Sequence, residues 1–281
     1  MIPLHVRYHL DMAEARARSS GGIQPKIALF DLDNTLLVGD IGEAVFARLL
    51  SDGAKMSCTW SDYRAFLRCD QSAAYRLSVE AMAGLAVRDV EEATIRVLNQ
   101  PEPFVAVEGA IVPVPRIHRA MKELVARLQD LRYVVYVISA SNQISVRIIA
   151  EDFLGIAPEH ALGLKSKIAD GRLTQVLQKP YPISTGKADL YRKVAGDIRP
   201  LITATDNPID APLLRLTDPA GFSIWVGENK AEFKSVRESL RLPQHICFVQ
   251  RPKDYSLRKR VRMLGEQWSS VQGSSPMLSE T

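Results

Sequence analysis

Short apolar runs alternate with amphipathic segments along most of this chain. The run from Tyr133 to Ile138 carries the β-branched and aromatic side chains typical of a strand buried on both faces. Strands that alternate with helices predict an α/β fold with a parallel sheet and right-handed crossovers. Strands are expected at residues 27–30, 133–138, 201–204, 222–226 and 246–249, helices at residues 41–50, 116–128, 143–153 and 187–195, and a short hairpin within residues 162–177.

The segment from residue 42 to residue 110 breaks this alternation and reads as helical. Trp60, Tyr63, Phe66 and Leu67 recur at three- and four-residue steps, which indicates one face of a helix. This block is therefore predicted to be an insertion after the first strand. The expected parts are an N-terminal extension (1–25), an α/β core (26–41 and 111–250), a helical cap (42–110), and a basic C-terminal helix with a disordered tail (251–281).

The composition narrows the class of protein. Of the 281 residues 46% are hydrophobic, yet no stretch approaches the about 18 uninterrupted apolar residues of a membrane span. The first 26 residues lack a secretory apolar region, and the three cysteines lack metal-ligand spacing, which predicts a cytoplasmic protein with reduced thiols. The oligomeric state stays open, with a homodimer as one option.

The charge does not favour nucleic acid as a partner. The net charge of +4 comes from 36 basic and 32 acidic residues, which is too balanced for binding over the whole surface. One basic run could meet RNA or a lipid surface, although the solvated face of a C-terminal helix is the favoured interpretation. Its members are Arg251, Lys253, Arg258, Lys259, Arg260 and Arg262.

Two carboxylates follow the first predicted strand. Asp31 and Asp33 stand one residue apart directly after the apolar residues 27–30, and ligands of open α/β sheets bind at the carboxyl ends of strands. Carboxylates this close repel each other unless a cation or a proton lies between them. A divalent metal such as Mg²⁺ satisfies this need, whereas an exposed acidic turn is the alternative.

Three further signals come later in the chain. Ser139 ends the strand at 133–138, where a hydroxyl can bind a phosphoryl oxygen or simply cap the next helix. Lys187 follows Gly186 and opens a helix, either as a point charge beside an anion or as a surface lysine. Asp206 and Asp210 follow the strand at 201–204 and supply a second pair of carboxylates.

Together these motifs resemble the haloacid dehalogenase superfamily of aspartate-dependent phosphohydrolases, over residues 27–214 and in that family's order. The helical insertion is similar to the superfamily's type 1 cap. The segment from Val137 to Ser141 and the later Asp170-Gly171-Arg172-Leu173-Thr174 are similar to its phosphoserine-phosphatase-like branch. The resemblance implies a Rossmann-like parallel sheet core with an inserted α-helical cap domain.

The resemblance also implies a role for each motif residue. Asp31 is the nucleophile and forms an aspartyl-phosphate, while Asp33 is the general acid and base. Mg²⁺ is held by Asp31, Asp206 and the backbone carbonyl of Asp33. The residues expected to support or contact the phosphoryl group are Thr35, Ser139, Ala140 and Lys187, with Asp210 in a supporting position. Thr205 replaces the usual glycine before Asp206, which leaves the carboxylate in place.

The cap of such enzymes recognises the leaving group of a small phosphorylated metabolite. Asp40 matches the acidic residue that holds the ammonium of phosphoserine, but a helix N-terminal aspartate explains it equally well. Ser78 stands at the position of the arginine that binds the substrate carboxylate in the family. Arg76 is the alternative, but it lies about half a helical turn away. The aromatic residues Trp60, Tyr63, Phe66 and Tyr75 form either a cage for a quaternary amine or, as favoured, the core of the cap.

Three functions remain open from the sequence. The favoured one is a Mg²⁺-dependent phosphatase that hydrolyses a small phosphomonoester, with phosphoserine or a similar amino-alcohol phosphate as a candidate. A phosphotransferase of the same fold needs the same Asp33 and is not separated by sequence. The alternative from another class is a catalytically silent binding protein.

Overall fold

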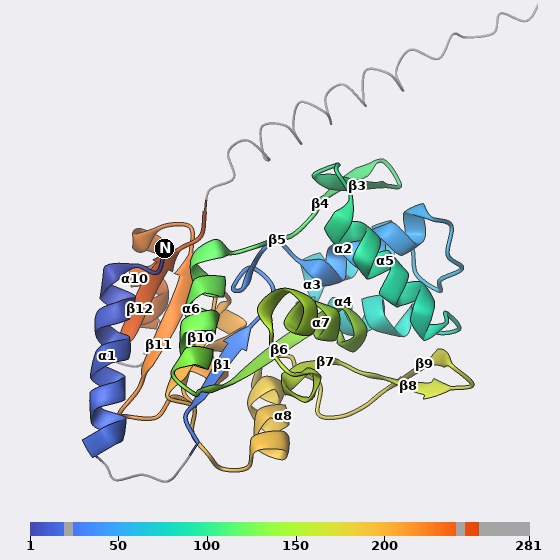
Figure 1. The fold of residues 1–281 in the computed structure, drawn as a ribbon. Coiled ribbons are helices and arrows are strands. Elements are labelled where there is room, and N and C mark those ends of the chain that lie inside the picture. The colour runs from blue at the N-terminus through green and yellow to red at the C-terminus, as the bar shows by residue number, and fades with distance from the viewer. Residues whose placement is uncertain (20–24, 240–244, 253–281) are drawn as a thin grey trace, which may run out of the picture.

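The computed structural model describes residues 1–19, 25–239 and 245–252. Within them a six-stranded sheet runs in the order β12-β11-β10-β1-β6-β7, and every neighbouring pair is parallel. The prediction of an α/β fold with a parallel sheet is therefore confirmed (Figure 1). The strands are β1 (Ile27–Asp31), β6 (Val134–Asn142), β7 (Ala161–Leu164), β10 (Ile202–Thr205), β11 (Phe222–Gly227) and β12 (Ile246–Gln250).

Helices cover both faces of the sheet, because its strands are apolar on both sides. In β1, Ala28 and Phe30 pack into the core that includes α1 and α6, whereas Ile27 and Leu29 pack into the core that includes α8 and α9. Trp225 of β11 packs with α9 and α10 on the second face. These helices are α1 (Leu4–Ser19), α6 (Arg119–Asp130), α8 (Thr185–Ala195), α9 (Ala211–Leu214) and α10 (Lys230–Ser239).

The block predicted as helical contains four helices and ends in a β-hairpin. The helices gather at one end of the molecule, on the right in Figure 1. The chain leaves the core through β2 (Leu37–Val38) and returns through β5 (Arg116–Ile117), which pair antiparallel with each other. The elements between them are α2 (Ile41–Ser51), α3 (Trp60–Cys69), α4 (Gln71–Glu80), α5 (Val87–Asn99), β3 (Phe104–Val107) and β4 (Ala110–Pro113).

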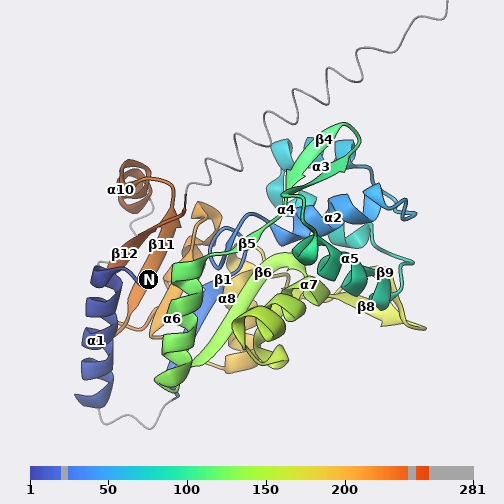
Figure 2. The same cartoon turned by 45° about the horizontal axis from the view of Figure 1, so that its top comes forward.

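The segment expected as one hairpin divides into a sheet strand and a shorter hairpin. β7 joins the edge of the sheet beside β6, and Gly163 is required there because an added Cβ would lie 2.7 Å from the Cα atom of Gln143. The helix α7 (Gln143–Ile148) with a π-helical continuation (Ile149–Phe153) connects β6 to this region. The hairpin of β8 (Ser166–Ala169) and β9 (Arg172–Leu177) extends to the cap, as Figure 2 shows, where Gly84 and Leu85 exchange backbone hydrogen bonds with Leu173.

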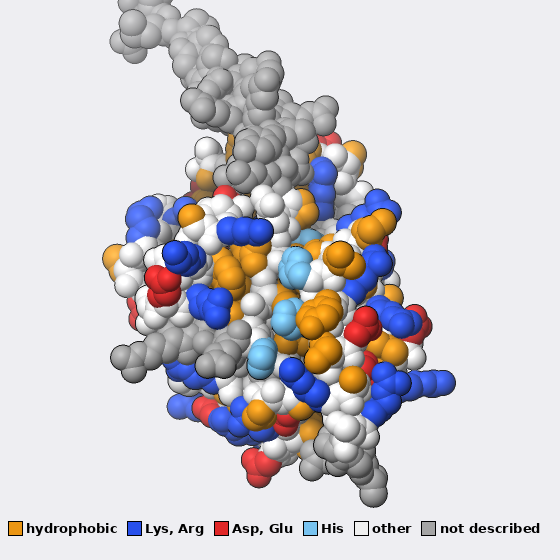
Figure 3. Space-filling view, turned by 90° about the vertical axis from the view of Figure 1, so that its left-hand side faces the viewer, with side chains coloured by type: hydrophobic (Ala, Val, Ile, Leu, Met, Phe, Trp, Pro, Cys, Tyr) orange, Lys and Arg blue, Asp and Glu red, His pale blue; other side chains and the backbone are white. Residues whose placement is uncertain are grey.

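The N-terminal extension contains a helix that packs on the sheet. Val6, Leu10 and Ala13 recur at one face of α1 and are buried. The opposite face exposes Leu4, Tyr8 and Met12, and Figure 3 shows hydrophobic and histidine side chains together on this side of the molecule. This packing is hard to predict from the sequence because charged residues interrupt the apolar stripe.

Some predictions fall outside these findings. The Gly-containing linker within residues 20–24, the basic residues from Lys253 onward and the tail lie outside the described residues. Within the described residues, no helix combines the length and the apolar character that a membrane crossing requires. A cytoplasmic location and a homodimer stay predictions.

We predict that Leu10→Ala destabilises the protein by about 2–5 kcal/mol, because it empties a packed position between α1 and the sheet. Urea denaturation followed by circular dichroism measures this change. Leu4→Ala is the matched control, since Leu4 lies on the same helix and is 81% exposed. Equal midpoints for the two variants would show that α1 does not contribute to the fold.

Candidate active site

The carboxyl end of β1 delivers the first carboxylate of the site. Asp31 is the last residue of β1, which lies between β10 and β6. A tight loop follows, in which the carbonyl of Leu32 accepts hydrogen bonds from the N–H groups of Thr35, Leu36 and Leu37. This loop turns the chain back at once, so that the side chains of Asp31 and Asp33 both line one cavity of about 260 Å³.

Asp31 is held by a lysine and a threonine. Its Oδ1 atom lies 2.6 Å from the Nζ atom of Lys187, and its Oδ2 atom accepts a hydrogen bond of 3.1 Å from Thr35. The same Nζ atom lies 2.6 Å from Oδ2 of Asp210. All three charged side chains are buried, and one ammonium group thus bridges carboxylates from two strand ends.

The position of Lys187 depends on the glycine before it. An added Cβ at Gly186 would lie 1.9 Å from the carbonyl oxygen of Tyr181, so no larger residue fits without movement of the backbone. Gly186 and Lys187 stand in the first turn of α8. The glycine lets this turn pack closely enough for the lysine to reach the ends of β1 and β10.

Asp33 receives three hydrogen bonds. The backbone N–H of Ile41 donates to its Oδ1 atom at 2.8 Å, and the hydroxyls of Ser139 and Ser141 donate to its Oδ2 atom at 2.6 and 2.8 Å. Ser139 is fully buried, whereas Ala140 and Ser141 line the cavity. The hydroxyl of Ser139 therefore contacts Asp33 in this structure, and Ser141 is a site residue that sequence reasoning missed.

The end of β10 supplies the second pair of carboxylates. Thr205, which replaces a glycine of the family pattern, donates a hydrogen bond of 3.3 Å to Asp210 and accepts one of 3.2 Å from the N–H of Asn207. Asp206 lines the cavity and forms an ion pair of 2.9 Å with Arg251 at the end of β12. The departure at Thr205 thus adds two contacts that fix the turn carrying both aspartates.

Burial sets the protonation of this cluster. Loss of hydration raises the pKa values of Asp31, Asp33, Asp206 and Asp210 above the ordinary range of a carboxyl group. At Asp206 the charge of Asp31 raises the pKa further. Burial alone would lower the pKa of Lys187, but the carboxylates of Asp210 and Asp31 outweigh it and raise that pKa, so the lysine stays charged.

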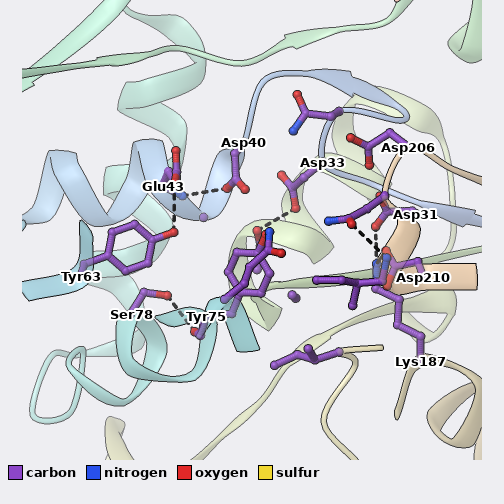
Figure 4. A pocket seen from close by; sticks show the side chains of 18 residues that line it. Asp31, Asp33, Asp40, Glu43, Tyr63, Tyr75, Ser78, Lys187, Asp206 and Asp210 are labelled. Carbon is purple, nitrogen blue, oxygen red and sulfur yellow. Dashed lines mark hydrogen bonds and ion pairs between the residues drawn. The ribbon is translucent and has the colours of Figure 1, made fainter. Parts of the chain in front are cut away.

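The cap covers the opposite side of the cavity. Asp40 is the N-cap residue of α2 and accepts a hydrogen bond of 2.8 Å from the N–H of Glu43, and it also lines the cavity. Both expected roles of Asp40 are therefore compatible with its position. Figure 4 shows Asp40, Glu43 and Tyr63 facing the group formed by Asp31, Asp206, Asp210 and Lys187. The remaining cap residues that line the cavity are Gly42, Gln71, Tyr75 and Ser78.

The other residues expected to recognise the substrate are Arg76 and the aromatic residues of the cap. Arg76 does not line the cavity, and its guanidinium lies 5.8 Å from the ring centroid of Tyr181. Trp60 and Tyr63 are buried and pack with Phe46, with ring centroids 6.3 and 5.4 Å from that of Phe46. Phe66 is 48% exposed. Trp60 and Tyr63 thus belong to the cap core, while Tyr63 and Tyr75 also line the cavity.

A sequence model of the haloacid dehalogenase-like hydrolases matches residues 28–215, which is more than half of the chain. The chain belongs to this family. The matched range contains every residue of the cluster from Asp31 to Asp210 and the whole cap. The expected membership of the superfamily is confirmed, and with it the prediction of an enzyme of the hydrolase type. No curated protein matches the chain.

Solved structures agree with this fold at low sequence identity. A protein of unknown function from Bordetella pertussis Tohama I has a TM-score of 0.60 at 16% identity, with 80% of this chain and 98% of that chain covered. A probable phosphoserine phosphatase from Vibrio cholerae has a TM-score of 0.54 at 14% identity, with 87% and 67% covered. A phospho-aspartyl intermediate analogue of phosphoserine phosphatase has a TM-score of 0.50 at 20% identity, with 85% and 99% covered.

We predict that Lys187→Met destabilises the fold by about 3–5 kcal/mol, because it leaves Asp31 and Asp210 buried without a counter-charge. Chemical denaturation at neutral pH measures the loss. The double variant Lys187→Met/Asp210→Asn should recover part of it, since one uncompensated carboxylate is gone.

Lys193→Met is the control, because Lys193 is an exposed lysine on the same helix. If Lys187→Met and Lys193→Met unfold at the same denaturant concentration, the buried ammonium does not balance the cluster.

Proposed function

We propose that this protein is a Mg²⁺-dependent phosphatase that hydrolyses a small phosphomonoester through an aspartyl-phosphate on Asp31. One observation carries the proposal: Asp31, Asp33 and Lys187 converge on the floor of a single small cavity that the cap covers. A nucleophile, an acid–base group and a fixed cation are the parts that such a reaction needs. The structural likeness to phosphoserine phosphatases is a likeness of fold and is compatible with this chemistry.

The first step forms the covalent intermediate. A carboxylate oxygen of Asp31 attacks phosphorus, the bond between phosphorus and the ester oxygen breaks, and Asp33 gives its proton to the departing oxygen. Burial raises the pKa of Asp33, whereas the hydrogen bonds from Ser139, Ile41 and Ser141 lower it. Lys187 offsets the repulsion between Asp31 and the anionic phosphoryl group.

The second step releases phosphate. Asp33, now ionised, takes a proton from water, and the water oxygen attacks phosphorus while the bond to Asp31 breaks. The hydroxyls of Ser139 and Ser141 and the N–H of Ile41 hold Asp33 in one orientation for both transfers. The groups proposed to contact or support the phosphoryl oxygens are Thr35, Ser139, Ala140 and Lys187, joined by Ser141.

The residues fit a divalent cation through their charge. With a proton on Asp33, the carboxylates of Asp31, Asp206 and Asp210 carry three negative charges, and Lys187 and Arg251 carry two positive ones, so the cluster keeps a net negative charge that favours a cation. Among the described residues no three His, Cys, Asp or Glu side chains form a metal-binding group. The proposed ligands are the two carboxylates of Asp31 and Asp206 and the backbone carbonyl of Asp33. Mg²⁺ bound there supplies positive charge for the phosphoryl oxygens.

We predict that Asp31→Asn lowers phosphate release by about 10⁴-fold, because the amide keeps the shape of the side chain and lacks the nucleophilic charge. Release of inorganic phosphate from p-nitrophenyl phosphate measures the rate, and circular dichroism checks the fold. Asp11→Asn, an exposed position on α1, is the control. A folded Asp31→Asn protein with near-normal turnover excludes the covalent mechanism, and product analysis in the presence of glycerol separates hydrolysis from transfer.

We predict that treatment with EDTA removes activity and that Mg²⁺ restores it, whereas Ca²⁺ inhibits because it accepts looser geometry and more ligands. Calorimetric titration of the stripped protein with Mg²⁺ measures binding directly. Asp206→Asn should weaken this binding, and Asp189→Asn, an exposed position on α8, should not. Full activity after exhaustive chelation would contradict the metal requirement.

A further inference from the structure

The charges that line the active cavity are unevenly distributed. On the cap side, Asp40 and Glu43 are acidic, and the other lining residues there are neutral. Among the described residues that line the cavity, Lys187 is the single cation. Its ammonium already bonds to Asp31 and Asp210, on the side away from the cap. The part of the cavity proposed to receive the leaving group therefore offers two acidic side chains and no cationic partner for a second anion.

Asp40 is the less compensated of the two cap-side acids. One of its oxygens accepts the N–H of Glu43, and no ion pair to Asp40 occurs among the described residues. Burial raises its pKa well above the usual range, and the charges of Asp33 and Glu43 raise it further. A carboxyl group in such a place is stabilised in its ionised form by a cation that arrives with a ligand.

Glu43 lies one turn into the same helix and points to the same part of the cavity. The hydroxyl of Tyr63 donates to its Oε1 atom at 3.1 Å, and Arg64 lies 3.7 Å from the same atom. The side chain of Arg64 is 45% exposed, so water screens this pair. Burial raises the pKa of Glu43 in spite of these partners. Glu43 thus remains available as a second acceptor for a cationic ligand.

The size of the cavity limits the leaving group. Its volume of about 260 Å³ is below the range of roughly 300–1,000 Å³ that is common for ligand pockets. A phosphoryl group occupies the end at Asp31, which leaves room for a leaving group of few heavy atoms. Ser78 lines the cavity and directs its hydroxyl to the carbonyl of Tyr75 at 2.9 Å, so this position holds a neutral group.

We infer that the substrate is the phosphate ester of a small amino alcohol that carries an ammonium group and no carboxylate. This inference rests on the proposed phosphatase function. The ammonium group donates hydrogen bonds to Asp40 and Glu43 and offsets the repulsion between them. A carboxylate on the same leaving group would be desolvated beside these acids without a partner, which excludes amino-acid phosphates as good substrates.

The experiment compares phosphate esters with and without an ammonium group and with and without a carboxylate. The full-length protein with Mg²⁺ is assayed with phosphoethanolamine, phosphoserine, glycerol 3-phosphate and p-nitrophenyl phosphate. We expect kcat/KM for phosphoethanolamine to exceed the values for phosphoserine and glycerol 3-phosphate by about 10²-fold. A value for phosphoserine equal to or above that for phosphoethanolamine overturns the inference.

The two proposals fail in distinguishable ways. If none of the four esters, p-nitrophenyl phosphate included, releases phosphate, the proposed phosphatase function itself is wrong. If p-nitrophenyl phosphate is hydrolysed but phosphoethanolamine has no advantage over glycerol 3-phosphate, phosphatase function stands and the assignment of the leaving group is wrong.

Substitutions of Glu43 and Asp40 test whether these side chains bind the ammonium group of the substrate. Glu43→Gln should lower kcat/KM for phosphoethanolamine by about 10- to 100-fold relative to glycerol 3-phosphate, mainly through KM, because it removes a charge that the ammonium contacts. Asp40→Asn should lower the same ratio. Glu92→Gln is the matched control, since Glu92 is a 53% exposed carboxylate on the same cap. An unchanged ratio in both cavity variants overturns the inference.

A gain of function provides the reverse test. Ser78→Arg places a cation on the cap side, and it should raise the phosphoserine-to-phosphoethanolamine ratio of kcat/KM by about tenfold or more. Ser61→Arg adds the same side chain at an exposed position of α3 and should leave the ratio as it is. If Ser78→Arg does not fold, the substrate comparison on the wild-type protein still decides the inference.

Discussion

The ammonium group of Lys187 is the interaction on which the site depends. It lies 2.6 Å from both Asp31 and Asp210, and all three side chains are buried. Without this cation, two carboxylates would be buried at neighbouring strand ends, and each would lose its hydration without compensation. The charge of the lysine lowers the pKa of Asp31 and so opposes burial, which raises it. The same contact therefore stabilises the fold locally and favours the ionised form of Asp31 that the proposed mechanism needs.

The sheet makes this contact reachable from distant parts of the chain. Parallel strands end at the same edge, so β1, β6 and β10 bring Asp31, Ser139 and Asp206 together although more than a hundred residues separate the first two. The next strands continue the pattern, because β12 carries Arg251 to within 2.9 Å of Asp206. Gly186 allows the start of α8 to pack closely against Tyr181. This close packing lets the side chain of Lys187 reach the ends of β1 and β10.

The sequence predicted the parts of the site that local patterns determine. Apolar runs followed by Asp31 or Asp206 identify strand ends, and Gly186 before Lys187 identifies a close helix start. Ser139 was expected to end its strand but lies within β6. Ser141 escaped notice because its role comes from the register of β6, whose last residues continue as a strand to Asn142 and turn this hydroxyl to Asp33. Arg251 lies 45 residues from Asp206 in the chain and 217 from Asn34, so no local pattern could connect them.

The helix α1 and the strand β7 were not predicted from the sequence, and both depend on tertiary packing. The helix α1 has only a narrow apolar stripe, and its burial depends on a sheet face that needs cover. The strand β7 is four residues long and contains Gly163, so its strand character depends on the edge of β6 beside it. In each case tertiary packing outweighed a weak local preference.

The core and the cap position different residues of the site. The strand ends fix the reacting groups, because a buried parallel sheet allows little movement of Asp31 or Asp206. The cap is joined to the core through the short β2–β5 ribbon and touches it again through the β8–β9 hairpin. Its helices can therefore differ in charge without disturbing the reacting groups. The acidic N-terminal turn of α2 and the neutral Ser78 on α4 are differences of this kind, and in the proposed function they act on the leaving group while the phosphoryl group binds on the side of Lys187.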